Sequence, residues 1–114
     1  MENINYRESY YKIESYIKIG VIYIRLERYE ESLKIFNKAA KIKYKSSEFW
    51  KSPLYANLYN NRGWTYYKLK KYKKAIKDFE RAIGFDYGYA IAYGNISLVK
   101  KVLNKGNRRK SLYI

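Results

Sequence analysis

The side chains that usually perform catalysis or bind metal ions are scarce in this sequence. Its 114 residues contain no histidine and no cysteine, which removes the commonest general base, nucleophile and metal ligands. The ten carboxylates are scattered, and Gly84, Gly88 and Gly94 have the spacing of a turn and a helix start rather than of a phosphate-binding loop. We therefore predict a protein that is not an enzyme and that needs no cofactor and no metal ion.

The most prominent chemical feature of the sequence is its excess of positively charged side chains. The net charge is +15, and it is uneven: residues 1–50 carry ten basic and seven acidic side chains, whereas residues 51–114 carry fifteen and three. The stretch 62–82 alone holds eight lysines and arginines with aromatic residues among them. Such a surface could attract nucleic acid or another acidic partner. The alternative is that part of the lysine content is only compositional.

The beginning of the sequence and its hydropathy bear on the compartment. The segment MENINYRESYY has neither the basic nor the apolar region of a secretory signal. No window approaches the run of about 18 apolar residues that a membrane span needs. We expect a cytoplasmic protein without a membrane span.

An internal repeat organises the chain. Residues 16–42 align with residues 59–85 at an offset of 43, and eight of the 27 aligned residues are identical. Each copy has the apolar spacing of two helices. Neither helix pair can bury its apolar face alone, so we expect the pairs to stack. The identical positions include Tyr16/Tyr59, Gly20/Gly63, Tyr23/Tyr66, Leu26/Leu69, Tyr29/Tyr72, Phe36/Phe79 and Ala39/Ala82.

Both copies resemble tetratricopeptide repeats, which are helix–turn–helix units of about 34 residues with glycine, aromatic and alanine residues at set positions. The resemblance implies an all-α fold of antiparallel helix–turn–helix repeats, stacked as a short right-handed solenoid with a C-terminal capping helix. Arg62 stands where the family usually has leucine, so either that layer is loosened or a neighbouring residue is adjusted to it. The expected boundaries are a single domain over 1–104, with repeat one at 13–46, an insertion at 47–55, repeat two at 56–89 and the cap helix at 90–104, followed by a basic tail at 105–114.

In this family the first helices of successive repeats line a concave groove. The resemblance implies an adaptor or scaffold that binds a peptide or helix there, with Trp64 and Tyr67 as anchors and Asn60 and Asn61 holding the peptide backbone. Alternatively, the ends of the chain or a second copy cover the groove. The groove positions carried onto this sequence are Ile17, Val21, Ile24, Asn57, Asn60, Asn61, Trp64, Tyr67, Lys68, Asn95 and Leu98.

One subgroup of the family grips the acidic C-terminal peptides of chaperones with a clamp of lysine, asparagine and arginine. Only Asn61 matches this clamp, so we expect no such co-chaperone activity. The clamp positions fall here on Ile17, Val21, Asn61, Ile91 and Asn95.

The second helices of the repeats are expected to form the convex back. The aromatic residues of 62–82 belong mostly to other faces, which weakens the case for stacking on single-stranded nucleic acid. Docking of this face on nucleic acid or on an acidic complex is the second candidate function. A subunit of an oligomeric assembly is the third, since so few repeats are near the minimum for stability. Two basic stripes are predicted there, comprising Lys34, Lys38, Lys41, Lys73, Lys74, Lys77 and Arg81.

Overall fold

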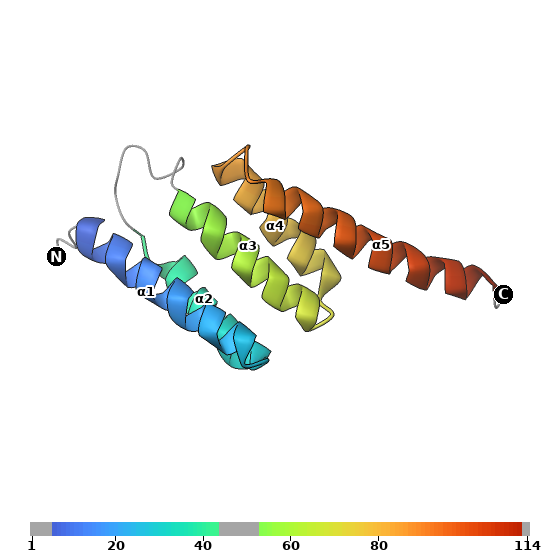
Figure 1. Ribbon diagram of the computed structural model, residues 1–114, viewed down its shortest axis with the longest axis horizontal. Helices are drawn as coiled ribbons and strands as arrows, with labels where there is room; N and C mark the ends of the chain where they lie inside the picture. The colour runs from blue at the N-terminus through green and yellow to red at the C-terminus, as the bar shows by residue number, and fades with distance from the viewer. Residues whose placement is uncertain (1–5, 44–52, 113–114) are drawn as a thin grey trace.

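The computed structural model describes residues 6–43 and 53–112, with side chains for 7–43 and 53–106. Over these residues the secondary structure consists of five α-helices, which Figure 1 shows as two antiparallel pairs followed by a longer helix. This confirms the predicted all-α arrangement of stacked helix pairs. The helices are α1 (Tyr6–Arg25), α2 (Tyr29–Lys41), α3 (Pro53–Lys68), α4 (Tyr72–Phe85) and α5 (Ala90–Leu112).

Close packing between a glycine and a phenylalanine holds each helix pair together. Phe36 and Phe79 are fully buried. A Cβ atom added to Gly20 would lie 2.4 Å from a ring carbon of Phe36, and one added to Gly63 would lie 2.7 Å from Phe79. No side chain fits at either glycine, so the first helix of each pair lies directly against the ring on the second. This contact explains why the two copies share both residue types.

The turns within the two helix pairs are also equivalent. Glu27 and Lys70, which correspond at the offset of 43, both have positive φ, at 58° and 62°. The backbone N–H of Arg28 donates to the carbonyl of Tyr23 at 2.9 Å, and Lys71 donates to Tyr66 at 2.8 Å. These bonds close each first helix with a left-handed residue. The turn at Lys70 and Lys71 is thus a defined helix cap.

Arg62, which departs from the family pattern, forms a buried ion pair. Its Nε and Nη2 atoms donate to the two carboxylate oxygens of Asp78 at 2.7 and 2.9 Å. The side chain of Asp78 is fully buried and that of Arg62 is 13% exposed. Burial lowers the pKa of Arg62, but the hydrogen bond and the charge of Asp78 raise it more, so the net pKa lies above its ordinary value. Of the two interpretations of Arg62, an adjusted neighbour is the correct one.

Polar bonds also join the two repeats. Arg62 Nη1 donates to Asn37 Oδ1 of α2 at 3.2 Å. The hydroxyls of Ser32 and Thr65, both fully buried, lie 3.2 Å apart. Such buried bonds fix the register of α3 on the first repeat, because a shift would leave these groups unpaired.

Two predicted boundaries are wrong. The cap helix does not end at 104, since α5 continues to Leu112 through the expected tail. Gly106 is a single glycine, whose cost of about 1 kcal/mol is too small to end a helix of otherwise compatible residues.

At the other boundary, α3 begins at Pro53, within the expected insertion. Proline is well suited to the first position of a helix. Leu54 and Tyr55 are buried, and the Tyr55 ring stacks on Phe85 at 5.2 Å. The remainder of the insertion, 47–52, lies outside the described residues.

Candidate functional site

Two adjoining hollows lie between α1 and α3, and we call them together the α1–α3 groove. They have volumes of about 280 and 350 Å³ and share Ile17, Lys18 and Asn57 as lining residues. The groove runs along the two first helices, where the sequence predicted one. The first hollow is completed by Tyr10, Glu14, Pro53 and Leu54, and the second by Val21, Ile22, Arg25 and Asn61.

The floor of the α1–α3 groove is apolar and firmly supported. Ile17 is only 4% exposed and packs in the core of the first repeat, against which Val21 and Ile24 also pack. Tyr10 lies seven residues before Ile17 and therefore shares its helix face. Because the floor is part of the core, it is already formed before any ligand binds.

Asn57 and Asn61 form an amide pair on the α3 wall. Asn61 Nδ2 donates to the side-chain oxygen of Asn57 at 2.7 Å and to its backbone carbonyl at 2.9 Å. These bonds leave the Nδ2 group of Asn57 and the Oδ1 atom of Asn61 uncommitted in the described structure. Such a free donor and free acceptor can bond to the C=O and N–H groups of a peptide backbone.

Asn60 and Asn95 have a different role from the one predicted. Asn60 is only 7% exposed, and its Oδ1 atom accepts a bond of 3.0 Å from Asn95 Nδ2. The two amides therefore join α5 to α3. This burial leaves Asn60 little accessible surface for the predicted contact with a bound backbone, since its Oδ1 atom is already paired.

The aromatic residues of α3 lie beyond the two hollows. The rings of Trp64 and Tyr67 are 5.2 Å apart, and the Lys68 ammonium lies 5.3 Å from the centre of the Trp64 ring. Tyr67 also contacts Tyr72 of α4, with ring centres 5.9 Å apart. Trp64 and Tyr67 are both partly buried and lie further along α3 than the groove; we call them together the aromatic ledge. Leu98 of α5, another predicted groove residue, is 37% exposed.

Seven lining residues were not among the predicted groove positions: Tyr10, Glu14, Lys18, Ile22, Arg25, Pro53 and Leu54. Tyr10 was missed because repeat one was expected to begin at 13, whereas α1 begins at Tyr6. Its spacing of seven from Ile17 was the available signal. Lys18 pairs with Glu14 at 3.5 Å, so part of its charge is already balanced.

The basic residues predicted for the convex back are all exposed, as expected. Two of them also take part in the fold: Arg81 donates to Asp78 at 2.6 Å, and the Lys74 ammonium lies 5.7 Å from the Tyr66 ring centre.

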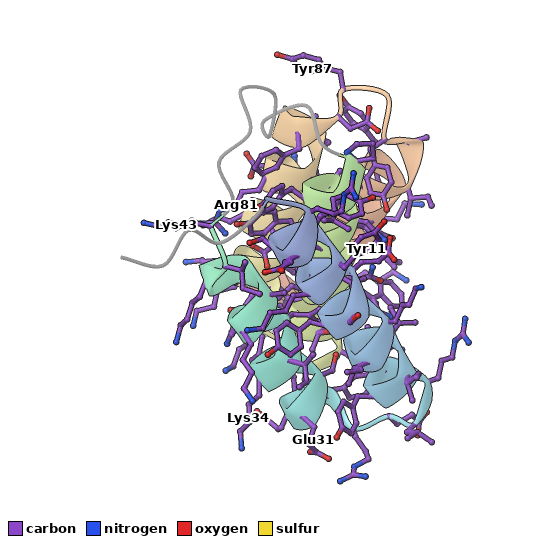
Figure 2. The ribbon with its side chains drawn as sticks, turned by 90° about the vertical axis from the view of Figure 1, so that its left-hand side faces the viewer. Tyr11, Glu31, Lys34, Lys43, Arg81 and Tyr87 are labelled. Carbon is purple, nitrogen blue, oxygen red and sulfur yellow. The ribbon has the colours of Figure 1, made fainter. Side chains whose placement is uncertain are left out.

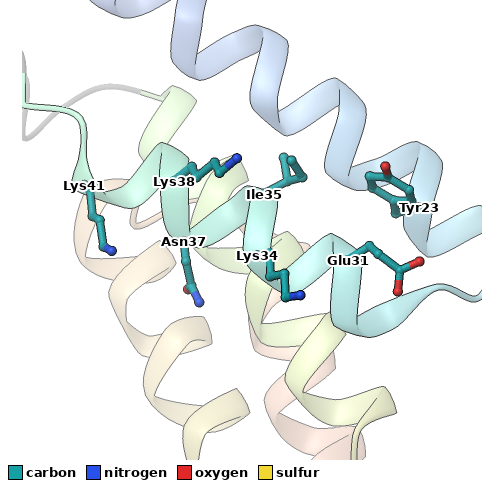
Figure 3. A pocket seen from close by; sticks show the side chains of 7 residues that line it. All are labelled: Tyr23, Glu31, Lys34, Ile35, Asn37, Lys38 and Lys41. Carbon is teal, nitrogen blue, oxygen red and sulfur yellow. The ribbon is translucent and has the colours of Figure 1, made fainter.

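Three other basic residues, Lys34, Lys38 and Lys41, surround a hollow of about 430 Å³ that also touches Tyr23. Figure 3 shows that Lys38 points to one side of α2, whereas Lys34 and Lys41 point to the other. The three ammonium groups thus do not converge on one ligand position.

No helix in the described part of the chain is long and apolar enough to cross a membrane.

Comparison with known proteins agrees with the fold and the repeat contacts described above. The chain is 25% identical over 101 residues to a protein of Guillardia theta named "Uncharacterized protein ycf37". This alignment covers 89% of the chain and 54% of that protein, so the chain spans about half the length of this relative. The sequence model of the tetratricopeptide repeat matches residues 11–87, which span both glycine–phenylalanine pairs. The chain therefore belongs to the tetratricopeptide repeat family.

Proposed function

We propose that this protein is a non-enzymatic adaptor that binds a peptide or helix of another protein in the α1–α3 groove. The tetratricopeptide repeat is a protein–protein interaction module, which supports a protein partner. The observation that carries the choice of surface is the preformed apolar floor beside the Asn57–Asn61 amide pair. Apolar side chains of the partner fill the hollows, and its backbone bonds to the amides.

The charges around the α1–α3 groove favour a segment with acidic residues. Arg25 lines the second hollow and Lys68 lies beside Trp64 beyond it, while Lys18 and Glu14 balance each other. The preferred ligand combines aliphatic or aromatic residues for the hollows with a carboxylate near Arg25. Charge complementarity of this kind contributes to specificity and to the rate of association.

A substitution that fills the groove tests the proposal. Peptides would be selected from a random library with the wild-type protein, and their dissociation constants measured by calorimetry. Asn57 is exposed at the groove, so Asn57→Arg places a bulky side chain in both hollows. We expect it to weaken binding by at least about tenfold, the loss of one good contact.

The matched control is Asn104→Arg, which makes the same substitution at an exposed position of α5. It should leave the affinity unchanged. If Asn57→Arg binds the selected peptides as tightly as the wild type does, the groove is not the binding site.

A second candidate function is docking on nucleic acid or an acidic complex through the convex back. The exposure of all seven basic residues favours it. The divergence of Lys34 and Lys38 around α2 argues against a defined anion site there. A steep fall of affinity with salt, together with sensitivity to loss of these lysines, would identify this mode.

A further inference from the structure

The first repeat presents a stacking surface of its own at the N-terminal end of the molecule. Within the chain, α3 stacks on the first repeat through one helix face, on which Leu54 and Leu58 are buried in the core and Thr65 bonds to Ser32. The residues of α1 that correspond to this face of α3 in the repeat alignment, at residue numbers lower by 43, form the equivalent face of α1. We call this face the end face; it comprises Tyr11, Ser15, Ile19, Ile22 and Leu26, of which Ile22 also borders the second hollow of the α1–α3 groove.

The end face is more aliphatic at its centre than its counterpart in repeat two. Ile19 and Ile22 take the places of Arg62 and Thr65. Their exposed fractions are 41% and 55%, and Leu26 and Tyr11 are each 58% exposed. Figure 2 looks onto this end of the molecule, with α1 and α2 in front and Tyr11 labelled on α1. A row of exposed aliphatic residues on a helix is typical of an interaction surface.

Charged residues lie at both ends of the end face. Glu27, at the turn after α1, is exposed, and Glu30 and Glu31 follow it in the first turn of α2. Lys12, near the other end of α1, is also exposed, as is Glu8 one turn before it. Lys12 precedes Ile19 by seven residues and Glu27 follows it by eight. Two copies of α1 packed antiparallel about Ile19 would therefore place Lys12 of each copy near Glu27 of the other.

We propose that the end face binds a second copy of this chain across a two-fold axis, with the two α1 helices antiparallel and Ile19 near the axis. A two-fold contact requires a surface that complements itself. The aliphatic centre of the end face meets this requirement, and the Lys12 and Glu27 positions add a complementary pair on each side of the axis. The contact also continues the stacking mode that α3 already uses inside the chain.

The overall charge distribution favours this contact over head-to-tail stacking. Residues 1–50 have a net charge of +3, from ten bases and seven acids, whereas residues 51–114 have +12, from fifteen bases and three acids. A two-fold contact through the end face keeps the two strongly basic parts at opposite ends. On α5, the face where a further helix would pack exposes Tyr93, Ser97 and Lys100, which do not complement an aliphatic row.

A single cysteine tests the geometry directly, because the chain has none of its own. Ile19→Cys places a thiol near the proposed axis, where the two copies can form a symmetric disulfide. Under mild oxidation this variant should become a covalent dimer in high yield at low protein concentration. Tyr93→Cys, a variant at an exposed position of α5, should remain largely monomeric. Equal cross-linking of the two variants would overturn the proposal.

The mass of the unmodified protein provides the second test. Sedimentation equilibrium should give a dimer that Ile19→Glu weakens by at least about tenfold and that Tyr93→Glu leaves intact. Circular dichroism would verify that both variants keep the helix content of the wild type. A wild-type protein that is monomeric at all concentrations overturns the proposal. Growth beyond two copies, abolished by Tyr93→Glu, would instead show head-to-tail stacking, which also overturns it.

Discussion

Arg62 and Asp78 form a bidentate ion pair at the positions where the first repeat has Ile19 and Ile35. The second repeat has thus exchanged two aliphatic residues for two charges while keeping the fold. The exchange is possible because Arg62 also bonds to Asn37, and Asp78 also accepts from Arg81. Each charge is therefore paired more than once in a site that is almost closed to water.

This pair predicts strong coupling between the two side chains. Arg62→Ile or Asp78→Ile alone leaves one charge without its main partner, and each should lower the free energy of unfolding by about 3–5 kcal/mol. The double variant restores the aliphatic pair of the first repeat and should recover most of that loss. Urea unfolding of the four proteins measures the coupling. Strictly additive losses would show that the ion pair is not the main role of these residues.

How far the sequence predicts such a feature depends on whether it is repeated. The Gly20–Phe36 and Gly63–Phe79 contacts appear twice in the alignment, so the fold and the helix pairing could be predicted. Asp78 occurs in one copy only, and its partner lies sixteen residues away on another helix. The contrast with Ile35 was visible in the sequence, but the packing that brings Asp78 to Arg62 was not.

The candidate site was predicted in part for a similar reason. The family resemblance placed Ile17, Val21, Asn57 and Asn61 on the groove side. It could not show that Asn60 lies beneath α5, because that depends on how closely the cap helix packs. The far end of α5 was misjudged because local composition suggested a tail, whereas the helix continues past Gly106.

The glycines provide a prediction with an internal control. Gly20→Ala brings a Cβ atom to 2.4 Å from the Phe36 ring, and the strain should destabilise the protein by about 1–3 kcal/mol. Gly84→Ala, in α4, meets no atom within 4 Å and should stabilise it by up to about 1 kcal/mol through helix propensity. Thermal unfolding compares the two. Equal effects of the two substitutions would contradict the close packing at Gly20.

The aromatic ledge should contribute to the affinity for a bound segment. Replacing Trp64 and Tyr67 together by alanine should weaken binding of a groove peptide by about 2 kcal/mol or more. The rings are partly exposed, so the far-ultraviolet circular dichroism spectrum should stay nearly unchanged. Titration calorimetry gives the affinity. An unaltered dissociation constant would restrict the binding site to the two hollows.

The convex lysines should contribute little to peptide binding. Lys34, Lys38 and Lys41 lie on α2, away from the α1–α3 groove, and charges beyond about 8 Å are screened at physiological salt. Changing all three to glutamate should alter the affinity for a groove peptide by less than about threefold, which fluorescence anisotropy can measure. A loss as large as that of Asn57→Arg would place part of the binding site on the back.

The chaperone clamp supplies a negative prediction. At the clamp positions Ile17 is buried and the amide of Asn95 is bonded to Asn60, so neither can grip a carboxylate. An acidic C-terminal chaperone peptide should show no binding at concentrations up to roughly 100 µM, weaker than about 5.5 kcal/mol. Surface plasmon resonance is sufficient for this test. Micromolar binding would mean that the clamp can be built from other residues.

The most direct measurement of the central claim is capture of partners from a lysate by three forms of the tagged protein, each with and without nuclease. The forms are the wild type, Asn57→Arg, and the variant with Lys34, Lys38 and Lys41 changed to glutamate. Binding in the groove predicts that the same protein is captured by the wild type and the lysine variant, survives nuclease, and is lost with Asn57→Arg. Capture that nuclease abolishes, or that Asn57→Arg retains and the lysine variant loses, would contradict it and assign the activity to the basic back.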